Sequence, residues 1–208
     1  PAAYLRDVFP NSEDELPAGW QWVKLGDVAE VKGGKRLPRG SKLIETNTGY
    51  PYIRVTDFQN NGINVSEVMY ISEEIQQGIS RYTINSDDVY ISIAGTTGLV
   101  GRIPEELTGA NLTENAAKLV ISDRSLLSPQ YLMKYLDSSK AQGDMNSRTN
   151  VVGQPKLALE RLRTIPVPLP PLEEQRRIAA ILNEQNAAAS LAEESIQQEL
   201  DTIEAMPA

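Results

Sequence analysis

The chain has neither cysteine nor histidine among its 208 residues. Without cysteine it has no disulfides and no thiolate metal ligands, and without histidine it lacks the commonest general base and the commonest transition-metal ligand. Catalysis of the Ser-His-Asp, Cys-His or zinc type is therefore excluded. We expect no metal site and no cofactor.

Long apolar runs are also absent, since none approaches the roughly 18 residues of a membrane span. The first residues lack the basic and then apolar pattern of a signal peptide. These absences predict a soluble, cytoplasmic protein without membrane contact. The length and a hydrophobic share of 40% suit one globular domain with an appended element.

Positive charge is scarce overall, with a net charge of −8, but the charges are segregated along the chain. Residues 1–30 carry six acids and two bases, and residues 172–208 carry eight acids and two bases. Residues 32–54 hold six bases against one acid, and residues 140–163 hold five against two. Because affinity for DNA rests largely on neutralising phosphates, these two basic stretches are the parts that suit nucleic acid.

Four prolines between positions 166 and 171 mark the sharpest boundary in the chain. They cannot pair as a central strand or continue a helix, so we expect an extended connector over 166–171. Apolar residues then recur at helical spacing, which predicts a long amphipathic helix over 172–208. Its apolar stripe suits pairing with a partner helix as a coiled coil. The stripe consists of Leu172, Ile178, Ile181, Leu182, Ile196, Leu200 and Ile203.

Residues 16–165 predict one mixed α/β domain, which places the whole chain in the α+β class. The candidate strands are short and rich in β-branched or aromatic residues, which favours a mostly antiparallel or mixed sheet. They are 52–55, 68–71, 89–93, 99–103 and 118–121. Ser128 and Pro129 predict the N-cap and the first residue of a helix that packs on the core.

Two segments have both a structural and a functional interpretation. Residues 95–101 match no phosphate-loop pattern, so they predict a glycine turn between two strands; alternatively, the Thr hydroxyls and glycine amides face a phosphate or a base edge. The loop 32–42 is either a solvated charged loop or a surface that contacts a DNA backbone. Carboxylates show no spacing typical of a glycosidase or a metal site, and no methyltransferase motif of the Asn/Asp-Pro-Pro-aromatic kind occurs.

Several segments resemble, in order, landmarks of the specificity subunits of type I restriction-modification systems. Residues 16–28 (LPAGWQWVKLGDV) resemble the opening of a target-recognition domain, and 50–57, 88–98 and 111–117 are similar to its internal landmarks. Residues 165–178 (IPVPLPPLEEQRRI) resemble the junction into the spacer helix of that family. The resemblance implies a non-catalytic module that reads one half of a bipartite site in double-stranded DNA. Its helix would set the spacing and dock methyltransferase subunits, with the restriction subunit as a further candidate partner.

A complete subunit of this kind has two recognition domains and two spacer helices, whereas this chain has one of each. Residues 1–9 resemble the segment that comes after a spacer helix, so we expect residues 1–15 to hold the end of a preceding spacer helix and a linker. We hypothesise a half-length unit, either a natural half subunit or a fragment, that forms a homodimer through its helices.

The candidates for DNA contact rest on residue chemistry, because the base-reading residues of the family vary with the target. Lys35, Arg36 and Arg39 are the candidates for phosphate contacts. The candidates for base reading are Arg54, Thr97, Arg148, Thr149 and Asn150. Two alternatives remain: a protein-binding adaptor without DNA contact, and an enzyme with an unrecognised carboxylate site.

Overall fold

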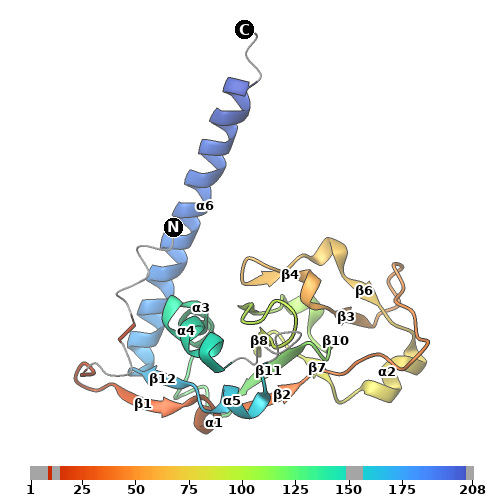
Figure 1. The fold of residues 1–208 in the computed structure, drawn as a ribbon, viewed down its shortest axis with the longest axis horizontal. Coiled ribbons are helices and arrows are strands. Elements are labelled where there is room, and N and C mark those ends of the chain that lie inside the picture. Colours follow the sequence, from red (N-terminus) through yellow and green to blue (C-terminus); the bar gives the residue numbers. More distant parts are fainter. Residues whose placement is uncertain (1–8, 11–14, 149–156, 205–208) are drawn as a thin grey trace.

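The proline-rich boundary separates a mixed α/β body from one long helix in the computed structural model. The structure describes residues 9–10, 15–148 and 157–204, and only the backbone at 148 and 202–204. Helix α6 (Leu172–Glu204) begins directly after Pro171 and projects from the body (Figure 1). Glu173 and Glu174 in its first turn are favourable to the helix dipole. Its 33 residues correspond to a rod of about 50 Å at roughly 1.5 Å per residue.

The central sheet has four antiparallel strands in the order β2-β11-β8-β9. The strands are β2 (Ala29–Gly33), β8 (Val89–Ser92), β9 (Val100–Gly101) and β11 (Ala116–Ile121). All four residues of β8 are buried. This burial explains why the strand begins with three consecutive apolar or aromatic residues and does not alternate apolar with polar residues.

A second sheet has the order β6-β3-β10-β7 and mixes one parallel pair, β3 with β10, with antiparallel pairs. Its strands are β3 (Pro51–Ile53), β6 (Met69–Tyr70), β7 (Thr83–Ile84) and β10 (Ala110–Leu112). Strands β4 (Phe58–Gln59) and β5 (Gly62–Ile63) form a separate hairpin. The expectation of short strands in mixed sheets is confirmed, although 99–103 and 68–71 each contribute only two strand residues.

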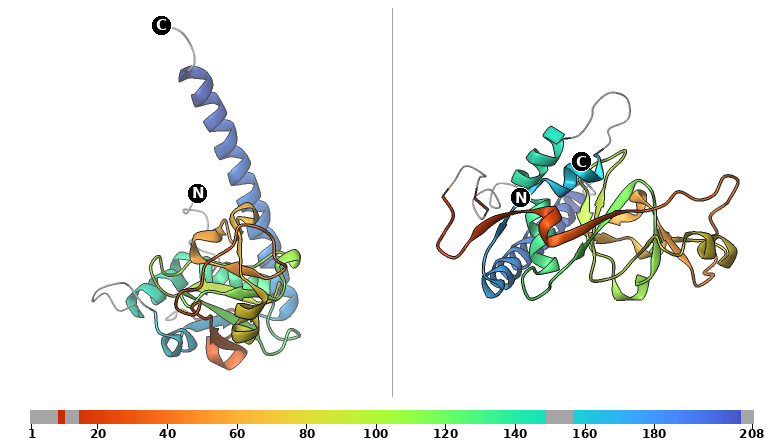
Figure 2. Two further views of the ribbon diagram at one scale, coloured as in Figure 1. Left: turned by 90° about the vertical axis from the view of Figure 1, so that its right-hand side faces the viewer. Right: turned by 90° about the horizontal axis from the view of Figure 1, so that it is seen from below.

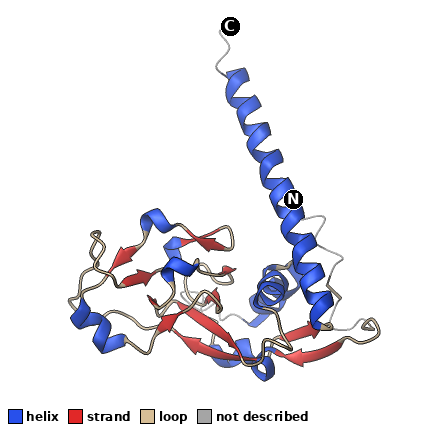
Figure 3. Cartoon of the chain, turned by 180° about the vertical axis from the view of Figure 1, so that it is seen from behind, coloured by secondary structure: helices blue, strands red, loops and turns tan. Residues whose placement is uncertain are grey.

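Short helices surround the sheets (Figures 2 and 3). They are α1 (Leu25–Val28), α2 (Glu73–Ile79), α3 (Pro129–Asp137), α4 (Ser139–Arg148) and α5 (Leu159–Arg163), with 3-10 turns at 55–57, 65–67 and 105–107. Helix α3 begins as the sequence predicts: the Ser128 hydroxyl accepts from the Tyr131 amide, and Pro129 is the first helical residue.

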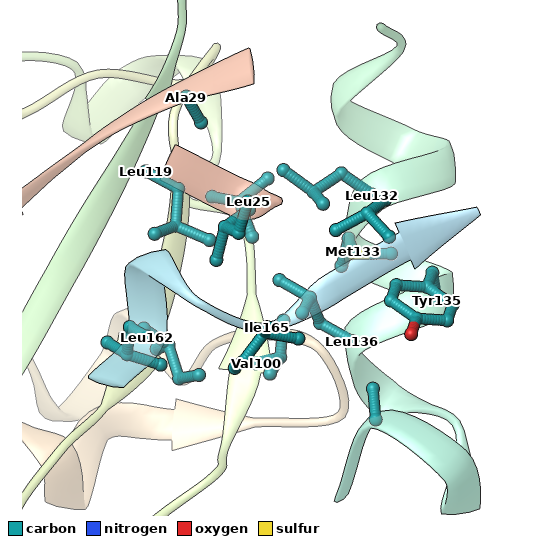
Figure 4. Packing of buried hydrophobic residues seen from close by; sticks show 14 of the residues in the cluster. Leu25, Ala29, Val100, Leu119, Leu132, Met133, Tyr135, Leu136, Leu162 and Ile165 are labelled. Atoms are coloured by element: carbon teal, nitrogen blue, oxygen red, sulfur yellow. The ribbon is translucent and has the colours of Figure 1, made fainter. Parts of the chain in front are cut away.

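The main hydrophobic core lies between the central sheet, α3 and α5, and Figure 4 shows how its side chains meet. Leu119 of β11 and Leu25 of α1 pack in one cluster with Leu132 and Leu136 of α3 and Leu162 of α5. Each fully buried side chain of this size contributes about 1.5–3 kcal/mol of hydrophobic stabilisation. Helices α3 and α5 are therefore fixed to the sheet.

The proline-rich segment is part of this packed body. Strand β12 (Pro166–Leu169) pairs antiparallel with β1 (Gln21–Lys24) in a two-stranded sheet, where prolines are tolerated because no central ladder is interrupted. The Tyr131 hydroxyl donates to the Pro168 carbonyl at 2.6 Å, and the Tyr135 hydroxyl donates to the Pro166 carbonyl at 2.5 Å. The segment is extended as expected, but it is an integral strand rather than a free connector.

The first three turns of α6 are also bound to the body. Ile178 and Leu182 are 7% and 2% exposed in the main core, and the buried Gln175 amide donates to the carbonyls of Leu126 and Pro170. The expectation that Ile178 and Leu182 face a partner helix is therefore wrong, because the domain itself covers them. In the part of the chain that the structure describes, no helix is long and apolar enough to cross a membrane.

Candidate nucleic-acid interface

One end of the central sheet gathers loops that are far apart in the sequence. Strand β11 starts beside the last residue of β2 (Ala117 pairs with Gly33) and beside the end of β8 (Ala116 pairs with Ser92). The residues that follow β2 and β8 and precede β11 therefore emerge at the same end. We call residues 34–37, 93–99 and 113–115 the loop edge.

Gly34 fixes the position of the basic loop on this edge. Its amide donates to the Ala116 carbonyl at 2.9 Å, and the next amide, of Lys35, donates to the Leu112 carbonyl at 2.8 Å. A Cβ atom on Gly34 would lie 2.1 Å from the Thr113 carbonyl oxygen, closer than side-chain atoms approach backbone. Only glycine lets the chain pass this close, so Gly34 determines where Lys35 and Arg36 stand.

Lys35 and Arg36 are exposed on the loop edge, and both interact with neighbouring loops. The Lys35 ammonium lies 5.5 Å from the centre of the Tyr82 ring, and the Arg36 Nε donates to Glu114 Oε1 at 2.5 Å. The hydrogen bond to Glu114 raises the pKa of Arg36. Burial opposes the charged form of Glu114, but hydrogen bonds from Arg36, from its own backbone amide and from Thr113 hold its pKa below the ordinary value.

The glycine loop after β8 lies on the same edge. The amides of Ile93 and Ala94 donate to the Asn115 carbonyl at 2.7 and 3.2 Å, which joins this loop to the turn that holds Glu114. The Gln142 side-chain amide of α4 donates to the Gly98 carbonyl at 2.8 Å. The prediction of a glycine turn between two strands is confirmed, since β8 and β9 pair directly.

A cavity of about 360 Å³ opens between this loop and the β4-β5 hairpin. Thr97 lines it from the loop, Gln142 from α4, and Gln59, Asn60 and Asn61 from the hairpin. Its walls include the Thr97 hydroxyl and four side-chain amides, of which those of Asn61 and Gln142 already donate to backbone carbonyls, and the Asp137 carboxylate. Hydroxyls and amides are groups that can donate to and accept from base edges. Among the predicted base readers whose side chains the structure describes, Thr97 lines this polar cavity and Arg54 does not.

The hairpin that borders the cavity was not among the predicted site residues. Asn60 and Asn61 have φ angles of 51° and 58°, as a two-residue hairpin turn with both residues left-handed requires. Asn61 donates from its side chain to the Val100 carbonyl at 2.9 Å, and Phe58 stacks on Tyr90 with ring centres 3.8 Å apart. The Asn-Asn-Gly run at 60–62 is typical of a tight turn, but such a run does not show which loop the turn meets.

Arg54 has a structural role in this arrangement. Its Nη2 lies 2.5 Å from Oδ1 of the fully buried Asp57 and 2.7 Å from the Glu67 carbonyl, and its Nε is 3.1 Å from both Asp57 oxygens. The hydrogen bonds to Asp57 raise its pKa. A guanidinium held by two groups of its own domain is not presented to a base edge in this structure.

The structure describes only some of the remaining residues that are predicted to contact DNA. Arg39 is exposed and lies beyond the loop edge in the same basic loop. Arg148 is the last residue of α4, the helix that contacts the glycine loop through Gln142. Its side chain, and residues Thr149 and Asn150 altogether, lie outside the described residues. Among the predicted residues whose side chains the structure describes, Lys35, Arg36 and Thr97 lie on one edge.

The fold and the basic loop edge define a domain of a known class. A family model described as the type I restriction modification DNA specificity domain matches residues 17–202, and the chain belongs to this family. Its curated relatives include the putative type I restriction enzyme MjaX specificity subunit of Methanocaldococcus jannaschii, 27% identical over 190 residues. The type I restriction enzyme EcoBI specificity subunit of Escherichia coli is 26% identical over 188 residues.

Solved structures agree with this assignment. A chain from a structural study of complex assembly and conformational transition of the type I R-M system is similar with a TM-score of 0.76 and 26% identity over 97% of this chain. The HsdS subunit from Thermoanaerobacter tengcongensis is similar with a TM-score of 0.68 and 27% identity over 91% of this chain.

The chain spans less than half the length of these proteins. It covers 43% of the MjaX subunit, 39% of the EcoBI subunit, and 47% and 43% of the two solved chains, although 87% to 97% of this chain is matched. The predicted family and the mixed α/β fold with a long C-terminal helix are confirmed. The DNA-contact residues remain predictions.

Proposed function

We propose that this chain is a non-catalytic DNA-specificity module that binds one half of a bipartite target through the loop edge and docks methyltransferase subunits through α6. The observation that carries the proposal is a combination: a family match over residues 17–202, and the convergence of Lys35, Arg36 and Thr97 on one end of the central sheet. Cationic side chains suit phosphates, and the hydroxyl and amides of the adjacent cavity suit base edges.

The length of this chain, compared with that of its relatives, supports the proposal that it binds only one half of a bipartite target. One recognition body and one helix correspond to under half of each matched protein. Ile196 and Leu200 are exposed on α6 beyond the part that packs on the body, and they are one turn apart. Ile181 is also exposed, on the outer face of the part that packs on the body. An exposed apolar stripe of this kind is typical of a helix that pairs with another helix. We therefore propose a homodimer whose two copies read two half-sites.

The proposal is tested by mapping methylation in cells that express the chain with its methyltransferase subunits. A two-fold dimer of identical recognition bodies predicts a palindromic, bipartite site, with the same half-site inverted across a fixed spacer. Methylation at a single undivided site would contradict the half-target arrangement. Methylation that is unchanged when the chain is omitted would contradict the whole proposal.

Charge reversal separates DNA binding from an adaptor function. Lys35→Glu combined with Arg36→Glu should weaken binding to a duplex and reduce the slope of log affinity against log salt by about 2, because two phosphate contacts are lost. Lys24→Glu, on exposed strand β1 outside the loop edge, is the matched control and should leave that slope nearly unchanged. An adaptor without DNA contact would show no duplex affinity in any of the three proteins.

A further inference from the structure

A second polar cavity, of about 430 Å³, lies where α6 leaves the body. Asn183 and Asn186 line it from α6, Lys134 from α3, and Arg102 from the chain just after β9. Asn60 of the β4-β5 hairpin closes the other side. In Figure 1, strand β4 lies on the side of the body toward which helix α6 projects. Residues of both the body and α6 therefore line this cavity.

Lys134 is the unusual residue in this cavity. It is only 8% exposed, and among the described residues its ammonium has neither a hydrogen bond nor an ion pair. Burial lowers its pKa, while Asp137, one turn further along α3, opposes that shift. The Lys134 ammonium is not among the described side-chain atoms that are buried without a hydrogen-bond partner, so the buried stem of the residue presents the charge to the water of the cavity. An anion that enters the cavity would therefore meet a cation that has no ion-pair partner among the described residues.

Arg102 is the second cation in the lining of this cavity, and it has no close carboxylate partner among the described residues. Its Nε and Nη2 donate to the Ser86 carbonyl at 3.1 and 2.7 Å, and its Nη1 donates to Gln130 at 3.2 Å. Asp87 lies 4.0 Å from Arg102 but 2.7 Å from Arg124, which is its closer partner. Glu105 is the acid that lines the cavity, and its carboxylate already accepts from the Ser86 hydroxyl.

We infer that this cavity is an anion site for a phosphate of the DNA backbone, held by Lys134 and Arg102 and by the amides of Asn60, Asn183 and Asn186. The assignment rests on the proposed function. Ammonium, guanidinium and amide donors are the groups that bind phosphate oxygens in protein-DNA interfaces. The alternative ligand, a carboxylate of a partner protein, is distinguished by its own outcome in the experiment.

Continuity with the loop edge favours DNA over a protein carboxylate. Asn60 and Asn61 line both this cavity and the one that Thr97 and Gln142 border, so the two cavities flank the same hairpin. Helix α3 runs along both, with Lys134 in one and Asp137 in the other. A duplex on the loop edge that continues toward α6 would place backbone phosphates along this path. The site would therefore hold DNA at the boundary between half-site and spacer.

The test compares Lys134→Met with wild type in the full chain. Methionine keeps an unbranched apolar stem in the buried position and removes only the charge. Binding to a random-sequence duplex of about 30 base pairs is measured between about 50 and 200 mM salt. The variant should have a smaller slope of log affinity against log salt, by about 1, so that wild type loses roughly three- to fourfold more affinity over this range. Lys24→Met is the matched control and should keep the wild-type slope.

Each other outcome overturns the assignment in a recognisable way. If Lys134→Met and wild type have equal slopes while Lys35→Glu with Arg36→Glu binds the duplex more weakly, the proposed function stands and the phosphate site at Lys134 is wrong. Unchanged slopes with a melting temperature that inorganic phosphate raises only in wild type would show a free-anion site. Unchanged slopes with lost affinity for the methyltransferase subunit would show a protein carboxylate as the ligand. If the wild-type chain does not bind the duplex at all, both the proposed function and the phosphate site are wrong.

Discussion

The Nε atom of Arg36 lies 2.5 Å from Oε1 of Glu114, so a candidate phosphate contact on the loop edge is paired with a carboxylate of its own chain. The Arg36 side chain is 78% exposed, and an ion pair this open to water adds little stability. Its consequence is electrostatic: the carboxylate reduces the positive potential at the surface where a duplex would approach.

Glu114→Gln is therefore expected to strengthen non-specific duplex binding. The substitution removes one negative charge beside Arg36 and keeps a side chain that still accepts a hydrogen bond. We expect roughly a three- to tenfold gain in affinity for a random-sequence duplex at low salt, decreasing as salt screens the charge. Fluorescence anisotropy measures the gain, and Glu106→Gln, an exposed acid outside the loop edge, is the control.

The pH dependence of this effect follows from the lowered pKa of Glu114. A carboxylate whose folded-state pKa lies below its unfolded value stabilises the fold above that unfolded value, and this contribution is lost as the pH falls through the folded-state pKa. Glu114 is therefore fully charged across about pH 6 to 8. The gain from Glu114→Gln should be the same at both ends of this range, and a gain that disappears toward pH 6 would contradict the assignment.

Gly34→Ala should displace the basic loop. The added Cβ would meet the carbonyl oxygens of Thr113 at 2.1 Å and Leu112 at 2.4 Å, and neither backbone group can move without disturbing β10 or β11. Overpacking of this kind lowers the free energy of unfolding by about 1–3 kcal/mol or more. Gly33→Ala is the matched control, because its Cβ would meet only a flexible methyl of Leu159 at 3.4 Å. Urea denaturation that shows equal losses for both variants would contradict this explanation.

Asp57→Asn should destabilise the second sheet region because it removes the charged partner of Arg54. Asp57 is fully buried and accepts from the Arg54 amide at 2.7 Å as well as from its guanidinium. Removing one partner of a buried ion pair is expected to lower the free energy of unfolding by about 2–4 kcal/mol. Glu67→Gln, an exposed acid beside the same arginine, should change it by less than about 0.5 kcal/mol. Thermal unfolding of the two variants checks the difference.

The sequence could predict the features that depend on local chemistry. Ser128 and Pro129 define the start of α3, the absence of Gly and Pro defines α6, and the apolar run of β8 defines a buried strand. Each of these follows from capping, backbone restriction or hydrophobic patterning within a few residues. The resemblance to a known family, which also depends on short local motifs, then predicted a function.

The sequence could not predict which loops meet. Arg36 and Glu114 are 78 residues apart, and their contact depends on the pairing of β2 with β11, which no local pattern specifies. Arg54 differs in this respect, because its partner Asp57 is only three residues away and the local 3-10 turn brings the two side chains together. Its charge makes Arg54 a candidate base reader, but charge alone does not take this local pairing into account. Ile178 and Leu182 fit a coiled-coil stripe by spacing, and only tertiary packing shows that they belong to the core of the domain, where α3 packs on α6.

The remaining stripe on α6 supports a final prediction about assembly. Ile196 and Leu200 are 57% and 47% exposed and lie on one face, whereas Leu191, 67% exposed, lies roughly 140° around the helix from Ile196 at about 100° per residue. If the helices pair through that face, Ile196→Glu with Leu200→Glu should remove two buried apolar side chains and add charge to the interface. A loss of about 3 kcal/mol or more corresponds to a roughly hundredfold weaker dimer. Leu191→Glu on the other face should leave the dimer intact. Sedimentation velocity distinguishes these cases, and a wild-type chain that stays monomeric at high concentration would contradict the homodimer, because the exposed stripe would then need a different partner helix.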